Sequence, residues 1–578
     1  MNRHRSRSLL AAAAVVAVAV AGCSDSGHQD RQRTSAGTQG TGAFADCGTH
    51  PDTCDSGQAK QGGTIRYTIE KTIPGWNPDF ADSNLFEVGE VMDGVMPAVF
   101  GTSPDLKPFL NTDLMQSATQ TNSNPQTLVY KVKKDAMWSD GQPIGFDDFQ
   151  YLKDVSDGIT CPACGPASTA GYKQIASMSA SDHGKTVTMV MRTPFADWQS
   201  LFSLLLPAHI AAQHGDLSTA RGLNASFRWF NDNVPTWSGG PFLISSYSKD
   251  QAITETPNPK WYGASKSTLD ELVFRIITNQ AQEAPALQNH DVDVIYPEPS
   301  PDLLAQVKQI PGVQSYLGKG LIWDHFDLNE NNQFLKDRVL RTAIFTAINR
   351  KDLIARTIGP LGITPAPLGN HMYVPGQPGY QDNVTNTGQG SGNLAKAKRM
   401  LAGAGYTGVG SKLTTAADQP VAIRCLYSVG NKARQSACLI AQNTLKQLGI
   451  NVTLRASIDL HEIGTGDFDM VIFGWVGTPF AAAGAQQVYE LKGGADYAHN
   501  NDPAAEKLIN QAAASTNPST VRSLLNQADK LITADAFELP LYQKPTFLAA
   551  RTNIVNIRDD ASSVGPPYND QQWGIRAK

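Results

Sequence analysis

The chain has 578 residues, of which 41% are hydrophobic and 17% charged, which is the composition of a globular protein too long for one hydrophobic core. Its formal net charge is −5, from 48 basic and 53 acidic side chains. Nucleic-acid binding requires a concentration of basic residues that this composition does not offer. We therefore expect two or three domains and no nucleic-acid partner.

The first 22 residues predict a secretory signal. Three arginines precede an apolar run from Leu9 to Val20, and small residues follow this run just before Cys23. The run is shorter than the roughly 20 apolar residues that a permanent membrane-spanning helix needs. The segment 20–23 resembles the lipobox of bacterial lipoproteins, which implies that residues 1–22 are cleaved and that Cys23 is lipidated. A free cysteine after an ordinary signal is the alternative.

Residues 23–62 are predicted to form a flexible tether. They are rich in Ser, Gly, Thr, Gln and Asp and contain few aliphatic residues. Such a composition buries too little apolar surface to become ordered. Together with a lipid on Cys23, the tether would hold the protein at the outer face of the bacterial cytoplasmic membrane.

Six further cysteines fall into three close pairs, which in an exported chain predicts disulfides. They are Cys47, Cys54, Cys161, Cys164, Cys425 and Cys438. Many connectivities are possible, and loop closure between near neighbours favours the three local pairs. The Cys161–Cys164 motif also fits a redox dithiol, but it lies in a loop rich in Gly, Pro and Ser. No metal site is predicted, because the histidines are scattered and two cysteine pairs at zinc-finger spacing are absent.

In the first half of the chain, residues 63–69 and 128–132 alternate as strands. Residues 269–277 predict another strand, 280–288 a helix and 292–296 a second β-rich run. This order is a βαβ pattern, which indicates an α/β fold.

The second half alternates more clearly between helices and strands. The predicted elements are a helix over 339–348, a helix capped by Asn349, a helix over 431–448 that stops at Gly449, a strand over 450–454, a buried strand over 468–476, helices over 503–513 and 519–534, and a last strand over 541–549.

Signatures of envelope hydrolases are missing, so no catalytic residue is predicted. No serine lies in a Gly-x-Ser-x-Gly elbow, and Thr465 stands where a zincin-like pattern would have its second histidine. Ser246 and Lys249 match a Ser-x-x-Lys pattern, but the surrounding sequence is strand-like. Residues three apart on a strand point to opposite faces, so this segment predicts a hairpin rather than a nucleophile. A hydrolase using Ser246 is the enzymatic alternative.

Several motifs then follow one another along the chain. They are 134–144 with Asp147, Asp148 and Phe149; 206–210; 240–242 with 258–263; 334–354; 404–406; and 540–542. As an ordered set they resemble the oligopeptide- and dipeptide-binding class, family 5, of the extracytoplasmic solute-binding proteins that serve ABC importers. The resemblance extends from about residue 62 to 551.

This resemblance implies an α/β fold of the periplasmic-binding-protein type, a type II two-lobe clamshell with an extra subdomain on the first lobe. The implied divisions are residues 63–110, 238–322 and 548–578 for lobe I, 111–237 for the extra subdomain and 323–547 for lobe II. Family members are not enzymes and need no cofactor. They enclose a ligand between the lobes by hinge closure, which the ligand favours by binding the closed form better.

The resemblance also implies two ligand-contacting segments. The first is Glu70, Lys71 and Thr72, at the end of the strand over 63–69, and the second is Gly474, Trp475 and Val476, after the buried strand. In the family, backbone groups of the second segment pair with an extended peptide as an added strand, and the indole supplies an apolar wall.

Thr478 departs from the family pattern. Peptide binders usually have an acidic residue at this place, where it neutralises the α-ammonium group of the peptide. A buried ammonium without a counter-charge is costly. Either another acid, such as Asp496 or Glu70, supplies the charge, or the ligand has no free amine there.

The sequence thus predicts a lipid-anchored, monomeric substrate-binding component of an ABC importer. Its partners would be a peptide or peptide-like solute and the permease subunits in the membrane. The alternative is a regulatory or scaffolding lipoprotein that has the same clamshell fold but binds a protein partner.

Overall fold

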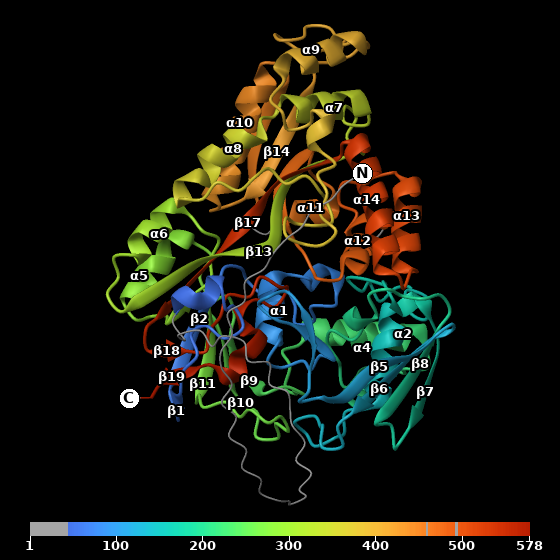
Figure 1. Ribbon diagram of the computed structural model, residues 1–578, viewed down its shortest axis with the longest axis vertical. Helices are drawn as coiled ribbons and strands as arrows, with labels where there is room; N and C mark the ends of the chain where they lie inside the picture. The colour runs from blue at the N-terminus through green and yellow to red at the C-terminus, as the bar shows by residue number, and fades with distance from the viewer. Residues whose placement is uncertain (1–43, 458–460, 492–494, 578) are drawn as a thin grey trace, which may run out of the picture. The chain divides into compact units, whose positions relative to one another are not determined.

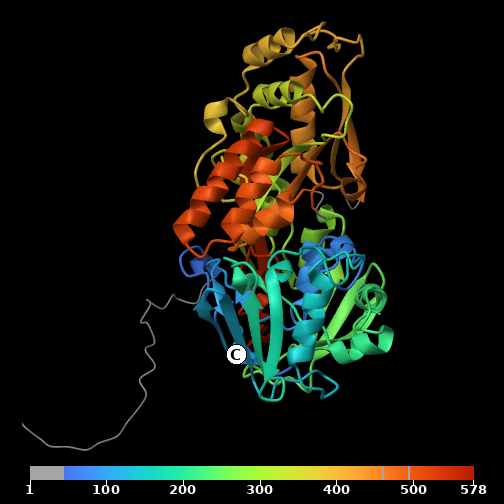
Figure 2. The same ribbon diagram turned by 90° about the vertical axis from the view of Figure 1, so that its right-hand side faces the viewer.

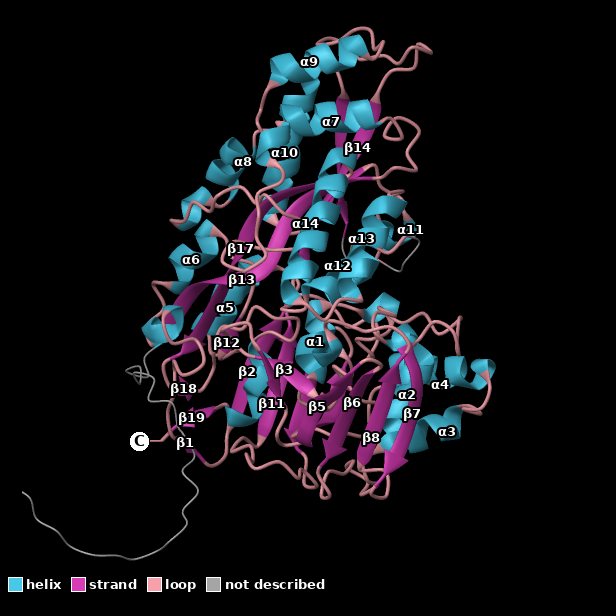
Figure 3. Ribbon diagram, turned by 45° about the vertical axis from the view of Figure 1, so that its right-hand side comes forward, coloured by secondary structure: helices cyan, strands magenta, loops and turns pink. Residues whose placement is uncertain are grey.

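A ten-stranded mixed sheet organises the fold (Figures 1 and 3). The structure, a computed structural model, describes residues 44–457, 461–491 and 495–577. The predicted signal and Cys23 lie outside the described residues. Within them, no helix is both long and apolar enough to cross a bilayer.

The strand order in the sheet is β15-β14-β16-β13-β17-β12-β2-β11-β10-β9. The strands are β2 (Thr64–Ile69), β9 (Phe242–Ser248), β10 (Ala252–Pro257), β11 (Glu271–Ile276), β12 (Val294–Ile295), β13 (Val313–Leu328), β14 (Ala422–Ser428), β15 (Asn451–Ser457), β16 (Met470–Val476) and β17 (Glu538–Arg551).

The two long strands β13 and β17 run through both halves of this sheet. Residues 313–319 of β13 pair with 545–551 of β17 on the side of β12 and β2, and the register shifts between Lys319 and Trp323. Beyond that shift β13 pairs with β16 as well as with the first residues of β17. The β13–β17 pair has one set of strands on each side. Two continuous strands therefore join the two halves of the sheet.

Local sequence signals explain the elements around these strands. Strands β11 and β12 both run parallel to β2, with helix α5 (Glu283–Gln288) between them in the chain, so the predicted βαβ unit is confirmed. Helix α10 (Lys432–Lys446) begins after Asn431, whose side chain accepts a hydrogen bond from the Arg434 N–H. Gly449 follows the helix with φ +90°, a conformation that favours glycine.

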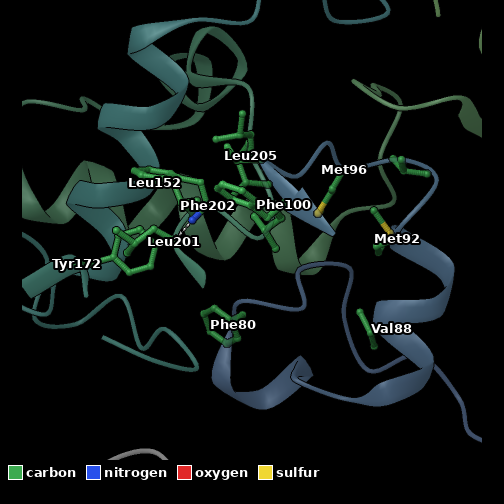
Figure 4. Packing of buried hydrophobic residues seen from close by; sticks show 14 of the residues in the cluster. Phe80, Val88, Met92, Met96, Phe100, Leu152, Tyr172, Leu201, Phe202 and Leu205 are labelled. Atoms are coloured by element: carbon green, nitrogen blue, oxygen red, sulfur yellow. Dashed lines mark hydrogen bonds between the residues drawn. The ribbon is translucent and has the colours of Figure 1, made fainter. Parts of the chain in front are cut away.

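A second sheet of four strands, ordered β5-β6-β8-β7, forms an additional layer with helices α2, α3 and α4. These elements are β5 (Met115–Ser123), β6 (Gln126–Val132), β7 (Ile175–Ser181), β8 (Thr186–Met191), α2 (Phe146–Ser156), α3 (Ala208–His214) and α4 (Ala220–Asp232). Their hydrophobic core is continuous with the core on the β2 side of the large sheet, because Phe80 and Met92 belong to the same cluster as Leu152 and Phe202 (Figure 4). Within this cluster the Phe202 N–H donates a hydrogen bond to the Tyr172 hydroxyl.

The remaining α-helices pack on the sheets or on one another. They are α1 (Phe86–Met92), α6 (Pro301–Val307), α7 (Arg338–Ala347), α8 (Arg350–Thr357), α9 (Leu394–Gly403), α11 (His461–Thr465), α12 (Ala481–Tyr489), α13 (Pro503–Ala513) and α14 (Pro518–Asp535). Small pairings complete the fold: β3 (Phe100–Thr102) with β4 (Pro108–Leu110), and β1 (Ala59–Lys60) and β18 (Ile554–Val555) on either side of β19 (Gly574–Arg576).

Two sequence interpretations of local structure agree with these elements. The cysteines are joined in the three local pairs, Cys47–Cys54, Cys161–Cys164 and Cys425–Cys438. Ser246 lies exposed on β9, and Lys249 lies in the turn that leads to β10, so the Ser-x-x-Lys match is a hairpin.

The segment before β2 differs from the expectation of a tether as far as residue 62. From Phe44 onward the chain packs on the body: Phe44 is 4% exposed, and β1 pairs with β19 near the C-terminus. Asp55 is buried and accepts a hydrogen bond from the Ile557 N–H at 3.1 Å. The prediction of a flexible tether is therefore wrong for residues 44–62. Their composition is polar, but one aromatic residue, Phe44, and one disulfide, Cys47–Cys54, order the segment.

This packing predicts a measurable contribution to stability. We expect a chain that begins at residue 63 to lose at least about 2 kcal/mol of unfolding free energy relative to a chain that begins at residue 41, because burial of Phe44 alone accounts for about that amount. Denaturant titration of both chains measures the difference. Equal unfolding midpoints would contradict an integral role for residues 44–62.

Candidate functional site

Strand β16 has an unpaired edge beyond the two positions at which it pairs with β14. The two strands pair at only two positions, Cys425 with Met470 and Leu426 with Val471, whereas β14 continues beside β15 as far as Ser428. On its other side β16 pairs with β13 over its whole length. Alternate residues of an antiparallel strand turn their N–H and C=O groups away from the partner. Among the described strands none pairs with the β14 side of residues 472–476, so these groups are available to another chain.

Gly474 lies on this edge for a steric reason. A Cβ atom at this position would lie 2.9 Å from the Asp324 Oδ1 atom and 3.1 Å from the Arg434 Nη2 atom. These two atoms are themselves joined by a hydrogen-bonded ion pair of 2.9 Å. A side chain on residue 474 would therefore disturb a buried ion pair.

Aromatic side chains form a layer next to the edge. The half-buried Trp475 ring is nearly parallel to the rings of His325 and Tyr497, with centroid distances of 5.6 and 5.7 Å. Trp323, which is 6% exposed, lies directly opposite Trp475 in the register of β13 and β16. Within the described part of the chain, the indole N–H groups of both tryptophans are buried without a hydrogen-bond partner, so both can donate to a ligand.

A small cavity lies beside this aromatic layer. Its lining includes Trp475, Tyr489, Asp496, Asp327 and Glu538, and it has room for roughly one water molecule. Two of the predicted ligand-contacting residues, Trp475 and Asp496, thus share one cavity. The Asp496 carboxylate accepts hydrogen bonds from the Asn500 backbone and side chain at 2.9 and 2.8 Å.

Glu298, which follows β12, connects the two sides of the sheet. Its carboxylate contacts the Arg434 guanidinium at 3.2 Å and also binds the Lys544 ammonium group and the Asn431 amide. Its backbone N–H donates to the Glu70 carboxylate at 2.9 Å. We call Glu298, Glu70, Arg434 and Lys544 the hinge cluster, because they come from both sides of the β13–β17 pair.

The charges of the hinge cluster shift two carboxyl pKa values in opposite directions. Burial and the neighbouring Glu298 carboxylate raise the pKa of Glu70 to about 7. Burial would also raise the pKa of Glu298, but the Arg434 and Lys544 charges outweigh it and lower that pKa to about 2. Glu298 is therefore the anionic member of the pair, and Glu70 holds a proton over much of the acidic range.

The structure places the other predicted residues as follows. Lys71 forms an ion pair of 2.9 Å with Glu87 of α1, and Thr72 is exposed. Val476 lies opposite Ile322 on β13.

The Thr478 hydroxyl accepts a hydrogen bond from the Phe480 N–H at 2.8 Å, just before helix α12. A series of polar contacts leads from Glu70 to the strand edge: Glu70 binds the Glu298 N–H, and the Glu298 carboxylate binds Arg434, whose guanidinium lies next to Gly474. Thr478 lies apart from this series, in the turn before α12.

Contacts also join helices α12 and α13 to the extra layer formed by the four-stranded sheet (Figure 2). The Asp197 carboxylate accepts a hydrogen bond from the Ala483 N–H, in the first turn of α12, at 2.8 Å. The Ala196 N–H donates to the Ala513 carbonyl at 2.7 Å, and Lys173 binds Glu490 at 2.5 Å. An acidic group at a helix N-terminus is a favourable pairing.

Sequence patterns did not identify the residues that connect these segments. Glu298, Arg434 and Lys544 are far apart in the chain and lie in no recognisable motif. The same is true of Asp327 and Glu538, which line the cavity, and of the neighbouring His325. One signal was available: His325 and Asp327 are polar residues two apart, and so on one face, in the buried last part of β13.

Comparisons with known proteins now identify the family. The model of the bacterial extracellular solute-binding proteins, family 5 (middle region), matches residues 110–497. Oligopeptide-binding protein OppA of Mycobacterium tuberculosis (strain H37Rv) is 32% identical over 554 residues, which cover 94% of this chain and 90% of that protein.

Solved structures give the same result. The periplasmic EDTA-binding protein EppA superposes with a TM-score of 0.85 and 34% sequence identity, covering 91% of this chain and 99% of that one. The oligopeptide-binding protein AppA from Bacillus subtilis, in complex with a nonapeptide, has a TM-score of 0.79 at 19% identity, covers 90% of this chain and 100% of that one, and supports the fold alone.

The resemblance seen in the sequence motifs and the α/β two-lobe clamshell that it implied are therefore confirmed. The chain belongs to the bacterial extracellular solute-binding proteins of family 5.

Proposed function

We propose that this protein is the lipid-anchored substrate-binding component of an ABC importer and that it captures an oligopeptide or peptide-like solute by closure of its two lobes. The unpaired edge of β16 is the observation that supports this most directly. An extended ligand adds to such an edge through main-chain hydrogen bonds, and pockets beside it select side chains. The peptide-binding name of the 32% identical OppA agrees with this assignment.

The aromatic layer supplies the rest of the binding surface in this proposal. Trp475 covers the ligand with an apolar face, while the unpartnered indole N–H groups of Trp323 and Trp475 donate to ligand carbonyl or carboxylate oxygens. Gly474 keeps the edge open to a ligand backbone, and Val476 continues the same edge. Glu70, Lys71 and Thr72 face the ligand from the other lobe.

The ligand in this proposal has no free α-ammonium group near Thr478. The Thr478 hydroxyl is engaged by the Phe480 N–H, and the Asp496 carboxylate is held by Asn500. The raised pKa of Glu70 also makes it a poor counter-charge at neutral pH. A relative at 34% identity carries the name EDTA-binding, and EDTA is a polycarboxylate rather than a peptide. Modified peptides and peptide-like polycarboxylates are therefore the solutes to test first.

The remaining parts of the proposal rest on the sequence motifs. Cleavage after residue 22 and lipidation of Cys23 place the protein at the outer face of the cytoplasmic membrane, where a permease receives the solute. We assign residues 63–110, 238–322 and 548–578 to lobe I, 111–237 to the extra subdomain and 323–547 to lobe II. In this proposal the protein is a monomer. The solute leaves unaltered, so the protein acts as a receptor and not as an enzyme.

Native mass spectrometry of the protein exported and purified from its own host tests this function. We expect a bound small molecule, and we expect Trp475→Ala to weaken its binding about thirtyfold, which corresponds to about 2 kcal/mol for the loss of a central aromatic contact. Trp229→Ala is the control, because Trp229 stacks on His214 in the extra subdomain.

Three results of that experiment would overturn the proposal. An empty crevice together with a stable protein partner would favour the scaffolding alternative. Conversion of the solute into a product, abolished by Ser246→Ala, would favour a hydrolase. Equal ligand affinity of the Trp475→Ala and Trp229→Ala variants would exclude the β16 edge as the binding surface.

Closure predicts a role for Asp197, which caps helix α12 from the extra subdomain. We expect Asp197→Ala to lower ligand affinity about fivefold, because loss of a capping interaction costs about 1 kcal/mol and this one forms when the lobes meet. Asp216→Ala is the control, since the Asp216 carboxylate bonds Ser218 within its own loop. Calorimetric titration measures both affinities; equal values would show that the contact does not favour the closed form.

The hinge cluster predicts a pH dependence of stability. The folded pKa of Glu70, about 7, lies above its ordinary value of 4.5, so the folded protein holds this proton more tightly than the unfolded chain. Its contribution to stability is present below about pH 4.5 and is lost as the pH rises to about 7. We therefore expect Glu70→Gln to be more stable relative to wild type at pH 7.5 than at pH 5.

Urea titration of both proteins at several pH values measures this difference. Thr72→Val, a change at the exposed neighbour that does not titrate, should give a difference from wild type that is independent of pH. A constant difference for Glu70→Gln would contradict the raised pKa.

A further inference from the structure

Three side chains with metal-binding groups converge on one buried point next to Trp475 in the aromatic layer. His325 and Asp327 are two residues apart on β13 and share one face, and Glu538 lies directly opposite Asp327 at the start of β17. One potential ligand atom from each residue lies within 4.8 Å of the others. The His325 Nδ1 atom is 2.7 Å from the Asp327 Oδ1 atom and 3.8 Å from the Glu538 Oε1 atom.

The cluster is buried and incompletely satisfied. The exposures of His325, Asp327 and Glu538 are 0%, 3% and 1%. Glu538 Oε2 accepts a hydrogen bond from the Tyr489 hydroxyl at 3.1 Å. Among the residues that the structure describes, neither Glu538 Oε1 nor His325 Nε2 has a hydrogen-bond partner. A buried carboxylate oxygen without a donor is costly, and a cation beside it would remove that cost.

The cavity next to the cluster provides space for a guest. Asp327 and Glu538 both belong to its lining, and its capacity of roughly one water molecule matches the needs of a small ion or its water ligand. One imidazole and two carboxylates are ligands that suit Zn²⁺ and related ions, whereas Ca²⁺ and Mg²⁺ prefer oxygen atoms alone. Three protein ligands with room for a water form an open coordination site.

We propose that His325, Asp327 and Glu538 bind a divalent transition-metal ion, with Zn²⁺ as the representative probe. No sequence pattern predicts this metal site, because the ligands come from two strands that are far apart in the chain. The site adjoins the proposed ligand wall, since the His325 ring stacks on Trp475. A metal on His325 fixes this ring and changes the surroundings of the Trp475 indole.

The test begins with wild-type protein, exported with its own signal and purified without chelators. We expect about one zinc ion per chain after dialysis. Titration of the metal-free protein with Co²⁺ should give a ligand-field absorption spectrum and quench tryptophan fluorescence. Absence of bound zinc together with absence of a Co²⁺ spectrum would overturn the proposal without any variant.

Variants then locate the ion. Glu538→Gln keeps the shape of the side chain and an acceptor for Tyr489, and we expect it to weaken Zn²⁺ binding by at least about tenfold. Asp327→Asn provides a second variant should the first fail to fold. Asp140→Asn is the matched control, because Asp140 contacts His209 on the surface at the same 2.7 Å and should leave affinity unchanged.

One further result would assign the metal elsewhere. A metal chelate bound as solute in the crevice would be lost in Trp475→Ala and kept in Glu538→Gln, which would overturn this site while leaving solute binding intact. Conversely, solute binding without any metal would reject this inference and preserve the proposed function.

Discussion

The pairing of β13 with β17 is the constraint on which the rest of the structure depends. These strands run through both halves of the sheet, and their register shifts where they pass from one half to the other. Residues at the candidate site lie on them or are bound to side chains from them, including Trp323, Asp324, Lys544 and Glu538. A hinge made of two continuous strands allows the lobes to rotate while these residues keep their spacing along each strand.

The polar groups at this hinge have to be paired because they are withdrawn from water. Glu298 is balanced by Arg434 and Lys544, and Arg434 in turn contacts Asp324. Removal of one partner from such a network leaves a charge without compensation, which costs more than the intact network gains. The network therefore specifies how the lobes meet, while the two large apolar clusters supply most of the stability of the fold.

Local sequence signals were sufficient for much of the fold. The alternation in 64–69, the helix after Asn431 and the buried run 470–476 all form the predicted elements, because period and capping act over a few residues. The segment 44–62 was expected to be flexible because its composition is polar, yet its few apolar residues pack against a distant part of the chain.

The candidate site was predictable only in part. Trp475 and Gly474 came from a resemblance between motifs, and the structure shows what that resemblance lacked: the open edge beside them and the unpartnered indole groups. Glu298 and Arg434 are far apart in the chain and come into contact only in the folded protein. Neither their spacing nor their residue types therefore marked them as parts of the site. Long-range pairing of charges leaves no periodic signal in a sequence.

The claim that the lobes close over an unaltered solute is tested most directly by measuring the distance between them. Spin labels at two exposed positions, Lys249 in the β9–β10 turn and Asn443 on α10, report this distance by pulsed electron resonance. The account predicts two populations without solute and a shift to the shorter distance when the copurified solute is added back. A single distance that does not respond to the solute would contradict closure as the mechanism of binding.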